Sequence, residues 1–558
     1  MRNILLWLTL GAAFTLTAQN INVSKFRQLG QELPTPNVYR TASGAPGHAY
    51  YQQQADYNMN ITLDDNTQRI YGKETITYTN NSPDELRYLW VQLDQNMRSK
   101  NSTTQEIKRG GIFSERGNTA QTAFNQLKKN QFYDFDGGFK IDYVQNSSGK
   151  NLRYTVNNTM MRIDLPMPLR KGQKFSFNIK WWFNINDRMD IGGRSGYEYF
   201  EEDDNYLYTI AQFFPRMAVY NDVEGWQNKQ FLGSGEFTLP FGDYKVSITV
   251  PSDHVVASTG KLTNEGKILS AKQRMRLSKA KRNYDDPVII VTQEEAELAE
   301  KEKSENSKTW IFEATNVRDF AFATSRKFIW DAQAVEINGK TTMAMSYYPK
   351  EGNPLWEQYS TRAVAHTLKV YSKFTVDYPY HKAISVHSKW IGMEYPQICF
   401  NGGRPEEDGT YSESTKYGMI GVIIHEVGHN FFPMIINSDE RQWTWMDEGL
   451  NTFVQYLTEQ EWDHEYPSRR GPAHKIVPYM SGPKEDMVPI MTNSESILQF
   501  GNNAYGKPAT ALNILRETVM GRDLFDYAFK EYSRRWAFKH PSPADFFRTM
   551  EDASGIDL

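Results

Sequence analysis

The stretch GVIIHEVGHNFFPMI, residues 421–435, decides how the second half of this 558-residue chain is interpreted. A helix would place His425 and His429 on one face, because residues four apart lie above one another, and Glu426 would lie beside them. Two imidazoles and a neighbouring carboxylate are the groups that a zinc ion and its water use. The HExxH pattern also arises by chance, so it defines a site only if further ligands accompany it.

A third ligand is expected on the following helix. The stretch WTWMDEGLNTFVQYL, residues 443–457, has an apolar stripe at helical spacing, and 18 residues separate His429 from Glu448. Three protein ligands leave one coordination position open, which is typical of catalytic zinc sites. We therefore predict one Zn²⁺ per chain, held by His425, His429 and Glu448. Asp447 either orients one of these ligands or caps the helix.

The spacing of apolar residues changes midway along the chain. Residues 58–96 alternate between polar and apolar positions and contain Asn and Gly turn signals, which is typical of antiparallel strands. After about Ile329 the apolar period shifts towards that of a helix. Further strands are predicted at residues 140–143, 154–165, 175–184, 243–251, 333–348 and 383–387, and helices at 356–375, 417–436, 446–461 and 505–519.

These motifs resemble the gluzincin signature of the aminopeptidase N (membrane alanyl aminopeptidase) family. HEVGH followed by the glutamate of WMDEG fits the family pattern, with Met446 and Asp447 at positions where the family usually has Leu and Asn. IGMEYP, residues 391–396, resembles the exopeptidase motif of the family, and NAYGKPATALNIL, residues 503–515, resembles the segment with its catalytic tyrosine. The chain is thus identified as a member, of a bacterial exported type.

The resemblance implies a role for each matching residue. Glu426 would act as the general base on the attacking water, and Tyr505 would stabilise the oxyanion. Glu394 would hold the free α-ammonium group of the substrate through a charge-assisted contact. The backbone of Gly392 and Met393 would contact the bound peptide.

The ammonium site of the family also includes a glutamine from the N-terminal domain, often followed two residues later by an acid. TIAQFFPRM, residues 209–217, offers Gln212 for this role, but Phe214 occupies the later position. Ile391 and Tyr395 replace the small residue and the Asn that flank the exopeptidase motif in the family. The preferred side chain of the first substrate residue therefore does not follow from the sequence.

The resemblance implies a multidomain α+β fold. An antiparallel β-rich, saddle-like domain would cover residues 19–328, with a charged helical insertion at about 292–308. A thermolysin-like, mainly helical zinc metallopeptidase domain would cover residues 329–558. Family members continue beyond the segment that matches residues 539–558, so the sequence is either trimmed or lacks the C-terminal helical module.

The implied function is that of a zinc metallo-aminopeptidase, which hydrolyses the N-terminal peptide bond of peptides with a free N-terminus. Two alternatives stay open: an endopeptidase of thermolysin-like chemistry, motivated by the missing acid near Gln212, and a peptide-binding relative without turnover. A net charge of -4, from 63 basic and 67 acidic residues, argues against nucleic acid as a partner. The oligomeric state and the physiological peptide do not follow from the sequence.

The N-terminus has the pattern of a secretory signal peptide. Residues 1–18 contain one Arg, an apolar run and small residues that end at Ala18. The run is shorter than the roughly 20 residues of a membrane helix, so we expect cleavage near Ala18 and no transmembrane anchor afterwards. The mature protein would then be periplasmic or secreted. Its single cysteine, Cys399, excludes an intramolecular disulfide and is expected to be a buried thiol.

Overall fold

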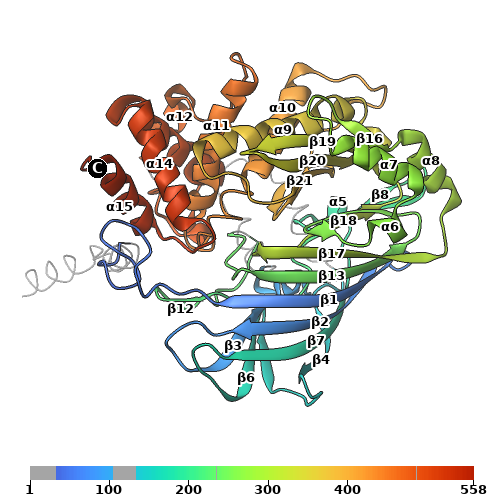
Figure 1. The fold of residues 1–558 in the computed structure, drawn as a ribbon, viewed down its shortest axis with the longest axis horizontal. Coiled ribbons are helices and arrows are strands. Elements are labelled where there is room, and N and C mark those ends of the chain that lie inside the picture. Colours follow the sequence, from blue (N-terminus) through green and yellow to red (C-terminus); the bar gives the residue numbers. More distant parts are fainter. Residues whose placement is uncertain (1–32, 105–133, 234, 485–486) are drawn as a thin grey trace, which may run out of the picture.

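The computed structural model describes residues 33–104, 134–233, 235–484 and 487–558 (Figure 1). Strands dominate the first half and helices the second, so the predicted multidomain α+β fold is confirmed. The predicted signal peptide at residues 1–18 lies outside the described residues. A search of the described helices finds none with the length and apolar character needed to cross a bilayer.

A seven-stranded sheet forms the base of the first half, in the order β15-β17-β13-β1-β2-β7-β4. Its strands are β1 (Gln54–Asp64), β2 (Arg69–Thr79), β4 (Lys140–Asn146), β7 (Lys174–Asn184), β13 (Gly242–Pro251), β15 (Lys261–Leu262) and β17 (Ser307–Val317). Buried and exposed residues alternate along β1, because successive side chains point to opposite faces. The strands of this sheet pair in antiparallel fashion except at one pair. β1 and β13 run parallel, because the long connection between them crosses over through other strands.

Smaller antiparallel sheets complete the β-rich half. One contains β3 (Leu86–Gln92), β5 (Tyr154–Asn157), β6 (Met160–Leu169) and β10 (Arg216–Met217). A second contains β8 (Gly196–Phe200), β9 (Asn205–Ile210), β14 (Val255–Ser258) and β18 (Phe322–Ser325), and a third contains β11 (Tyr220–Asn221) and β12 (Gly225–Trp226). β9 leads directly to Gln212, which adopts a left-handed backbone conformation with φ of 50°.

A six-stranded mixed sheet lies at the start of the second half, in the order β16-β19-β20-β21-β23-β22. Its strands are β16 (Val288–Val291), β19 (Ile329–Ile337), β20 (Lys340–Tyr348), β21 (Lys382–His387), β22 (Gly392–Tyr395) and β23 (Ile398–Asn401). Helix α9 (Leu355–Phe374) connects the parallel strands β20 and β21 and packs against the sheet. The strands predicted at 333–348 and 383–387 are confirmed, and β22, which carries Glu394, forms an edge of the sheet.

Helices make up most of the remaining chain. Those of the second half are α10 (Glu413–Gly428), α11 (Leu450–Trp462), α12 (Ala473–Met480), α13 (Lys507–Ile514), α14 (Arg522–Trp536) and α15 (Pro543–Ser554), with π-helical turns η4 (Trp445–Gly449), η7 (Gly501–Gly506) and η8 (Leu515–Val519). The first half contributes α5 (Arg188–Ile191), α6 (Glu265–Ile268), α7 (Ala271–Ala280) and α8 (Gln293–Glu302), the last within the predicted charged insertion. The domain boundary at residues 328 and 329 stays a prediction.

Helix α10 is shorter than the helix predicted at residues 417–436. It begins after Ser412, whose side chain accepts a hydrogen bond from the Thr415 amide at 3.1 Å, and it ends at Gly428. Pro433 has no N–H to extend the helical ladder, and its ring would clash with the carbonyl of His429 four residues earlier. The chain therefore turns away directly after the second histidine of the HExxH motif.

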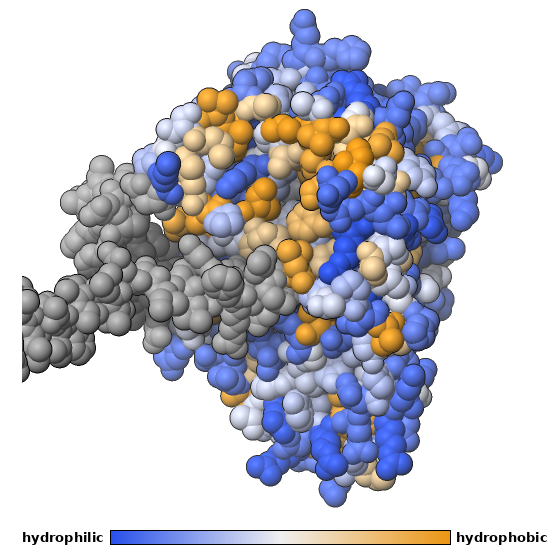
Figure 2. All heavy atoms as spheres, turned by 90° about the vertical axis from the view of Figure 1, so that its left-hand side faces the viewer, coloured by the Kyte–Doolittle hydropathy of each residue, from blue (hydrophilic) through white to orange (hydrophobic). Residues whose placement is uncertain are grey.

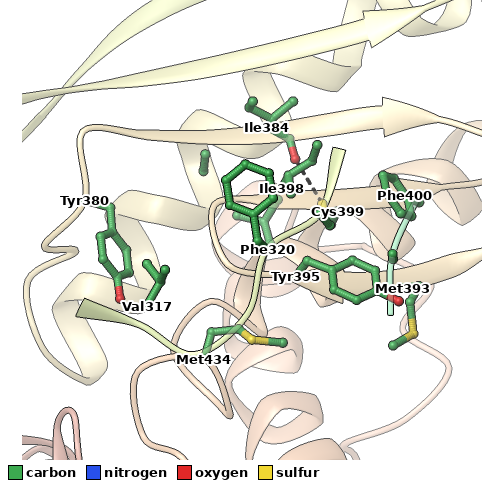
Figure 3. Packing of buried hydrophobic residues seen from close by; sticks show 14 of the residues in the cluster. Val317, Phe320, Tyr380, Ile384, Met393, Tyr395, Ile398, Cys399, Phe400 and Met434 are labelled. Carbon is green, nitrogen blue, oxygen red and sulfur yellow. Dashed lines mark hydrogen bonds between the residues drawn. The ribbon is translucent and has the colours of Figure 1, made fainter. Parts of the chain in front are cut away.

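The single cysteine lies in the core of the six-stranded sheet. Cys399 on β23 is fully buried, and its Sγ donates a hydrogen bond to the carbonyl of Ile384 at 3.3 Å. Apolar side chains such as Phe320 and Ile398 surround it (Figure 3). Burial raises the pKa of its thiol, so it stays protonated. The prediction of a buried thiol is confirmed.

One face of the molecule carries apolar side chains over its helical part. Figure 2 shows this face: its lower part is mostly hydrophilic, whereas apolar residues gather around a hollow in its upper part. Exposed apolar side chains of the C-terminal helices and their connections are Val477, Met480, Leu498, Ile514 and Val519. Helices α12 and α13 therefore leave part of their apolar surface facing solvent.

The first described segment of the chain packs against the last two helices, as the blue and red ribbons of Figure 1 show. Trp536 Nε1 donates to the carbonyl of Gly44 at 2.7 Å. Arg40 pairs with Asp222 at 2.8 Å and also with Asp545 on α15, and all three side chains are at least 97% buried (3%, 2% and 0% exposed). This buried ion cluster ties the two ends of the described chain together.

We expect Arg40→Met to destabilise the protein by about 3–5 kcal/mol, because it leaves two buried carboxylates without their cation. Chemical denaturation followed by tryptophan fluorescence measures the change. Arg534→Met is the matched control, because Arg534 is 70% exposed in its pair with Glu531. It should cost no more than about 0.5 kcal/mol. Equal losses for the two variants would contradict the role given to the buried cluster.

Candidate metal centre and active site

Helix α10 and turn η4 bring three candidate ligands to one point. The Nε2 atoms of His425 and His429 lie 3.0 Å apart, and Glu448 Oε2 lies 3.1 Å from the first and 3.2 Å from the second. Ligand atoms of a tetrahedral zinc site, each at about 2.0–2.1 Å from the metal, are roughly 3.3 Å apart. The geometry of the three side chains therefore fits a single zinc ion.

Hydrogen bonds behind the two histidines orient their rings. His425 Nδ1 donates to Gln455 Oε1 at 2.8 Å, and His429 Nδ1 donates to the carbonyl of Phe432 at 2.7 Å. With the proton on Nδ1, each Nε2 directs a lone pair towards the other and towards Glu448. A cation bound between these atoms would be held by two imidazole nitrogens and one carboxylate oxygen. The donor set and its outer partners are those of a catalytic zinc site.

Surrounding carboxylates add negative charge to this centre. Asp447 Oδ1 lies 2.8 Å from His429 Nδ1, which favours the orienting role for Asp447 over a helix cap. Burial alone would lower the pKa of His429, but Glu394, Asp447 and Glu448 outweigh it and raise that pKa well above its ordinary value. The same surplus of negative charge favours a bound metal cation.

Glu426 lies between the metal ligands and the edge strand β22. Glu426 is only 5% exposed. Its Oε2 has no hydrogen-bond partner among the described residues. A Cβ atom on Gly392 would approach Glu426 Oε1 to 2.5 Å, so only glycine lets β22 come this close. Burial raises the pKa of Glu426 to about 8. A bound dication nearby would lower that pKa again and leave a carboxylate with a free oxygen.

Tyr505 on η7 reaches the same point from the opposite side. Its hydroxyl donates to Glu448 Oε1 at 2.5 Å, and its ring stacks on His425 with the centroids 5.6 Å apart. The guanidinium of Arg470 lies 4.4 Å from the ring centroid of Tyr505. Burial and the Glu448 charge raise the pKa of the phenol, which keeps it protonated as a hydrogen-bond donor.

Glu394 and Gln212 each present an unpaired oxygen in the described part of the chain. Glu394 on β22 is 4% exposed, its Oε1 has no partner, and burial raises its pKa. Gln212 is 1% exposed, and its Oε1 also has no partner. Met393, the neighbour of Glu394, is buried in the core and leaves only its backbone for a ligand.

A carboxylate lies beside Gln212 in the structure, although position 214 is not an acid. It belongs to Glu236, which is 24 residues further along the chain. Glu236 Oε2 accepts a hydrogen bond from Gln212 Nε2 at 3.2 Å, and Glu236 Oε1 accepts from Arg194 at 2.8 and 2.5 Å. Phe214 instead packs in the core, against Tyr57. Sequence analysis missed Glu236 and Arg194 because both are remote from Gln212 along the chain and belong to no motif. Arg194 interacts with the charges of both Glu236 and Glu394.

A cleft of about 760 Å³ leads to the metal centre between α10 and α11. His425, Glu426 and Tyr505 line its inner end, and Val422 and Gly421 line one wall. The volume lies in the range of small-molecule and peptide-residue sites. The fold and this site together define the class of zinc metallopeptidases that bind the metal through an HExxH helix.

Comparisons with known proteins agree with this class. Residues 359–558 match the model of the Peptidase family M1 domain. A probable aminopeptidase 1 from Sulfurisphaera tokodaii is 27% identical over 170 residues, which cover 29% of this chain and 21% of that protein. The matched part thus spans about a fifth of that curated relative.

Solved structures extend the likeness to nearly the whole fold. The crystal structure of an M1 zinc metallopeptidase from Deinococcus radiodurans matches with a TM-score of 0.56, 14% identity and coverage of 92% of this chain and 93% of that one. A mutant of that metallopeptidase bound to a Tyr-Ser-Ala substrate matches with a TM-score of 0.54 and 14% identity, and covers 92% of this chain and 98% of its own. Residues 359–558 thus match peptidase family M1, and the chain shares the fold of these M1 zinc metallopeptidase structures.

We expect Gln455→Leu to weaken zinc binding roughly 10–100-fold, because it removes the acceptor that orients His425. Competition with a chromophoric chelator measures the affinity. Gln460→Leu on the same helix is the matched control, since the side chain of Gln460 bonds Ser468 at 3.4 Å instead of a ligand. An unchanged zinc affinity in Gln455→Leu would show that this hydrogen bond does not support the site.

Proposed function

We propose that this chain is a zinc metallo-aminopeptidase that removes N-terminal residues from peptides with a free α-amino group. The observation that carries the proposal is the position of Glu426, which interacts electrostatically with His429 and Glu448 and has its Oε1 against Gly392 on the strand that also bears Glu394. Hydrolysis and amine recognition would thus meet at one scissile bond. The names of the aminopeptidase relative and of the Tyr-Ser-Ala complex support the same substrate class.

One zinc ion per chain would be held by His425, His429 and Glu448. It would supply Lewis acidity to the scissile carbonyl and to the attacking water. Glu426 accepts the proton of that water at Oε2, the oxygen without a partner among the described residues, and then donates it to the leaving amine. Its burial keeps solvent from competing for the proton.

Tyr505 stabilises the oxyanion that forms on the substrate. Its hydroxyl stays protonated and lies within hydrogen-bond distance of Glu448, next to the proposed metal. A small rotation of the phenol transfers this hydrogen bond to the substrate oxygen, where a fixed donor lowers the barrier most. Arg470 stacks on the ring and holds it in place.

The substrate ammonium group would bind between Glu394 and Gln212. An ammonium carries three donors and needs acceptors when it is removed from water. Glu394 Oε1 and Gln212 Oε1 are such acceptors, because both are buried and unpaired within the described residues. Glu236 accepts a hydrogen bond from Gln212 Nε2. The amide oxygen of Gln212 therefore faces away from Glu236. Gly392 and the backbone of Met393 would border the bound peptide.

Glu236, the acid beside Gln212, removes the reason for considering the endopeptidase alternative. That alternative rested on the absence of an acid at position 214, and Glu236 supplies one from elsewhere in the chain. A site that closes around a free ammonium favours cleavage at the first peptide bond.

We expect hydrolysis of aminoacyl p-nitroanilides to depend on a free amine. N-acetylation of the same substrates should abolish turnover, because it removes the charge that Glu394 and Gln212 recognise. Glu394→Gln should lower kcat/KM on the free-amine substrates at least tenfold and keep the zinc content. Equal rates on free and acetylated substrates would refute the aminopeptidase proposal and favour endopeptidase chemistry.

We expect Glu426→Gln to keep one zinc per chain and to lose roughly 10²–10⁴-fold in kcat, because the proton acceptor is gone. Tyr505→Phe should lose roughly 10²–10³-fold in kcat with little change in metal content. Stopped assays give the rates, and elemental analysis gives the zinc content. Glu413→Gln, at the outer end of α10 and the mouth of the cleft, is the control. A Glu426→Gln protein with near-normal kcat would overturn the assignment of the base.

A further inference from the structure

A second cavity lies between the seven-stranded and the six-stranded sheets. Its volume is about 340 Å³, and it shares no lining residue with the cleft at the metal centre. Large apolar side chains from three strands form its walls: Trp310 and Phe312 of β17, Trp330 of β19, and Met343, Met345 and Tyr347 of β20. Each of these side chains is less than 10% exposed. The cavity is therefore a preformed apolar chamber of small-molecule size.

A buried lysine lines this chamber. Lys382, the first residue of β21, is 6% exposed, and its Nζ lies 5.3 Å from the ring centroid of Phe312. In the described part of the chain it forms no hydrogen bond or ion pair through Nζ. Burial lowers the pKa of Lys382 to about 7, and the charge of Glu265 only partly opposes this shift. A carboxylate bound beside Nζ would offset the cost of burying the ammonium form of Lys382.

The charges around the chamber are mostly positive. Lys261 and Lys281 line it together with Lys382, whereas Glu265 is its single carboxylate and already pairs with Lys281 at 3.5 Å. Burial, together with these three lysines, lowers the pKa of the nearby His381 to about 3. Burial is the largest cause of this shift, and the charges of the three lysines add to it.

The chamber adjoins a wider hollow that connects it with solvent. The hollow has a volume of about 900 Å³ and shares Lys261, Leu262, Glu265, Lys281 and His381 with the chamber. A ligand would therefore enter past the lysines at the mouth and place its apolar part against the aromatic walls. Inorganic anions would gain nothing from those walls, and a neutral apolar ligand would leave Lys382 unpaired.

We propose that this chamber is a binding site for an amphipathic monocarboxylate, whose apolar body packs against Trp310, Trp330 and Met345 and whose carboxylate pairs with Lys382. The site is separate from the proposed peptidase centre and does not depend on its activity. Aliphatic and aromatic carboxylic acids share this chemistry, and direct binding distinguishes between them.

Isothermal titration calorimetry of the full chain tests the site with three probes: decanoate, 3-(indol-3-yl)propionate and decan-1-ol. We expect one molecule of at least one of the two acids to bind per chain, at least tenfold more tightly than the alcohol. Tighter binding of decanoate would assign the site to aliphatic acids, and tighter binding of the indole acid to aromatic ones. Absence of binding of both acids at 1 mM would overturn the proposal.

Substitution of Lys382 tests where the carboxylate of the bound acid lies. Lys382→Met keeps an apolar stem of similar length without the charge, and it should weaken acid binding at least tenfold while decanol binding stays equal or improves. Lys340→Met is the matched control, because Lys340 is an exposed lysine at the start of β20 that does not line the chamber. An unchanged thermal unfolding midpoint of Lys382→Met verifies its fold. Unchanged acid binding in Lys382→Met would overturn the pairing.

Proton uptake gives an independent readout on the unmodified chain. Lys382 is largely neutral in the free protein at pH 8, and a bound carboxylate would restore its charge. The other titratable groups that face the chamber are Lys261, Lys281, Glu265, His381 and Tyr347. Binding heats of the acid measured at pH 8 in two buffers of different ionisation enthalpy should reveal uptake of close to one proton. Binding without proton uptake would contradict the carboxylate–lysine pair.

Discussion

The close approach of the ligand atoms of three metal-binding side chains is the interaction around which the site is organised. His425, His429 and Glu448 hold these atoms 3.0 to 3.2 Å apart at the junction of α10 and η4. The packing behind them resists separation: Asn451 donates to the carbonyl of His425 at 2.9 Å, and a Cβ on Gly428 would approach the Tyr371 hydroxyl to 2.2 Å. The fold thus maintains an arrangement that becomes favourable when a metal cation binds.

Buried ion pairs fix the β-rich half against this centre. Arg318, which follows β17, pairs with Glu440 just before η4 at 3.2 Å, and both side chains are fully buried. Arg318 also donates to the carbonyl of Pro433, directly after the HExxH helix, at 3.0 Å. Separating the two halves would leave these charges unpaired in the interior, which is costly.

Much of the local structure could be predicted from the sequence, because it depends on neighbouring residues. Alternating apolar residues predicted β1 and β2, and helical spacing predicted α9 and α11. Other features depend on distant partners or on one special residue. Helix α10 ends at Gly428 and not near residue 436 because of Pro433, and β1 pairs in parallel with β13, a strand remote from it along the chain.

The grouping of the candidate metal and base residues on one helix follows from local sequence alone. Two histidines four residues apart on a helix must share a face, so His425, Glu426 and His429 form a local unit in any fold that keeps that helix. The positions of the groups that would hold a ligand, by contrast, depend on the tertiary structure. Glu236 lies beside Gln212, and Lys382 lies in an apolar chamber, because strands distant in sequence pack together there. Residues that are close in the fold but distant in sequence produce no periodicity or motif in the chain. Packing and the pairing of buried charges bring them together only when the chain folds.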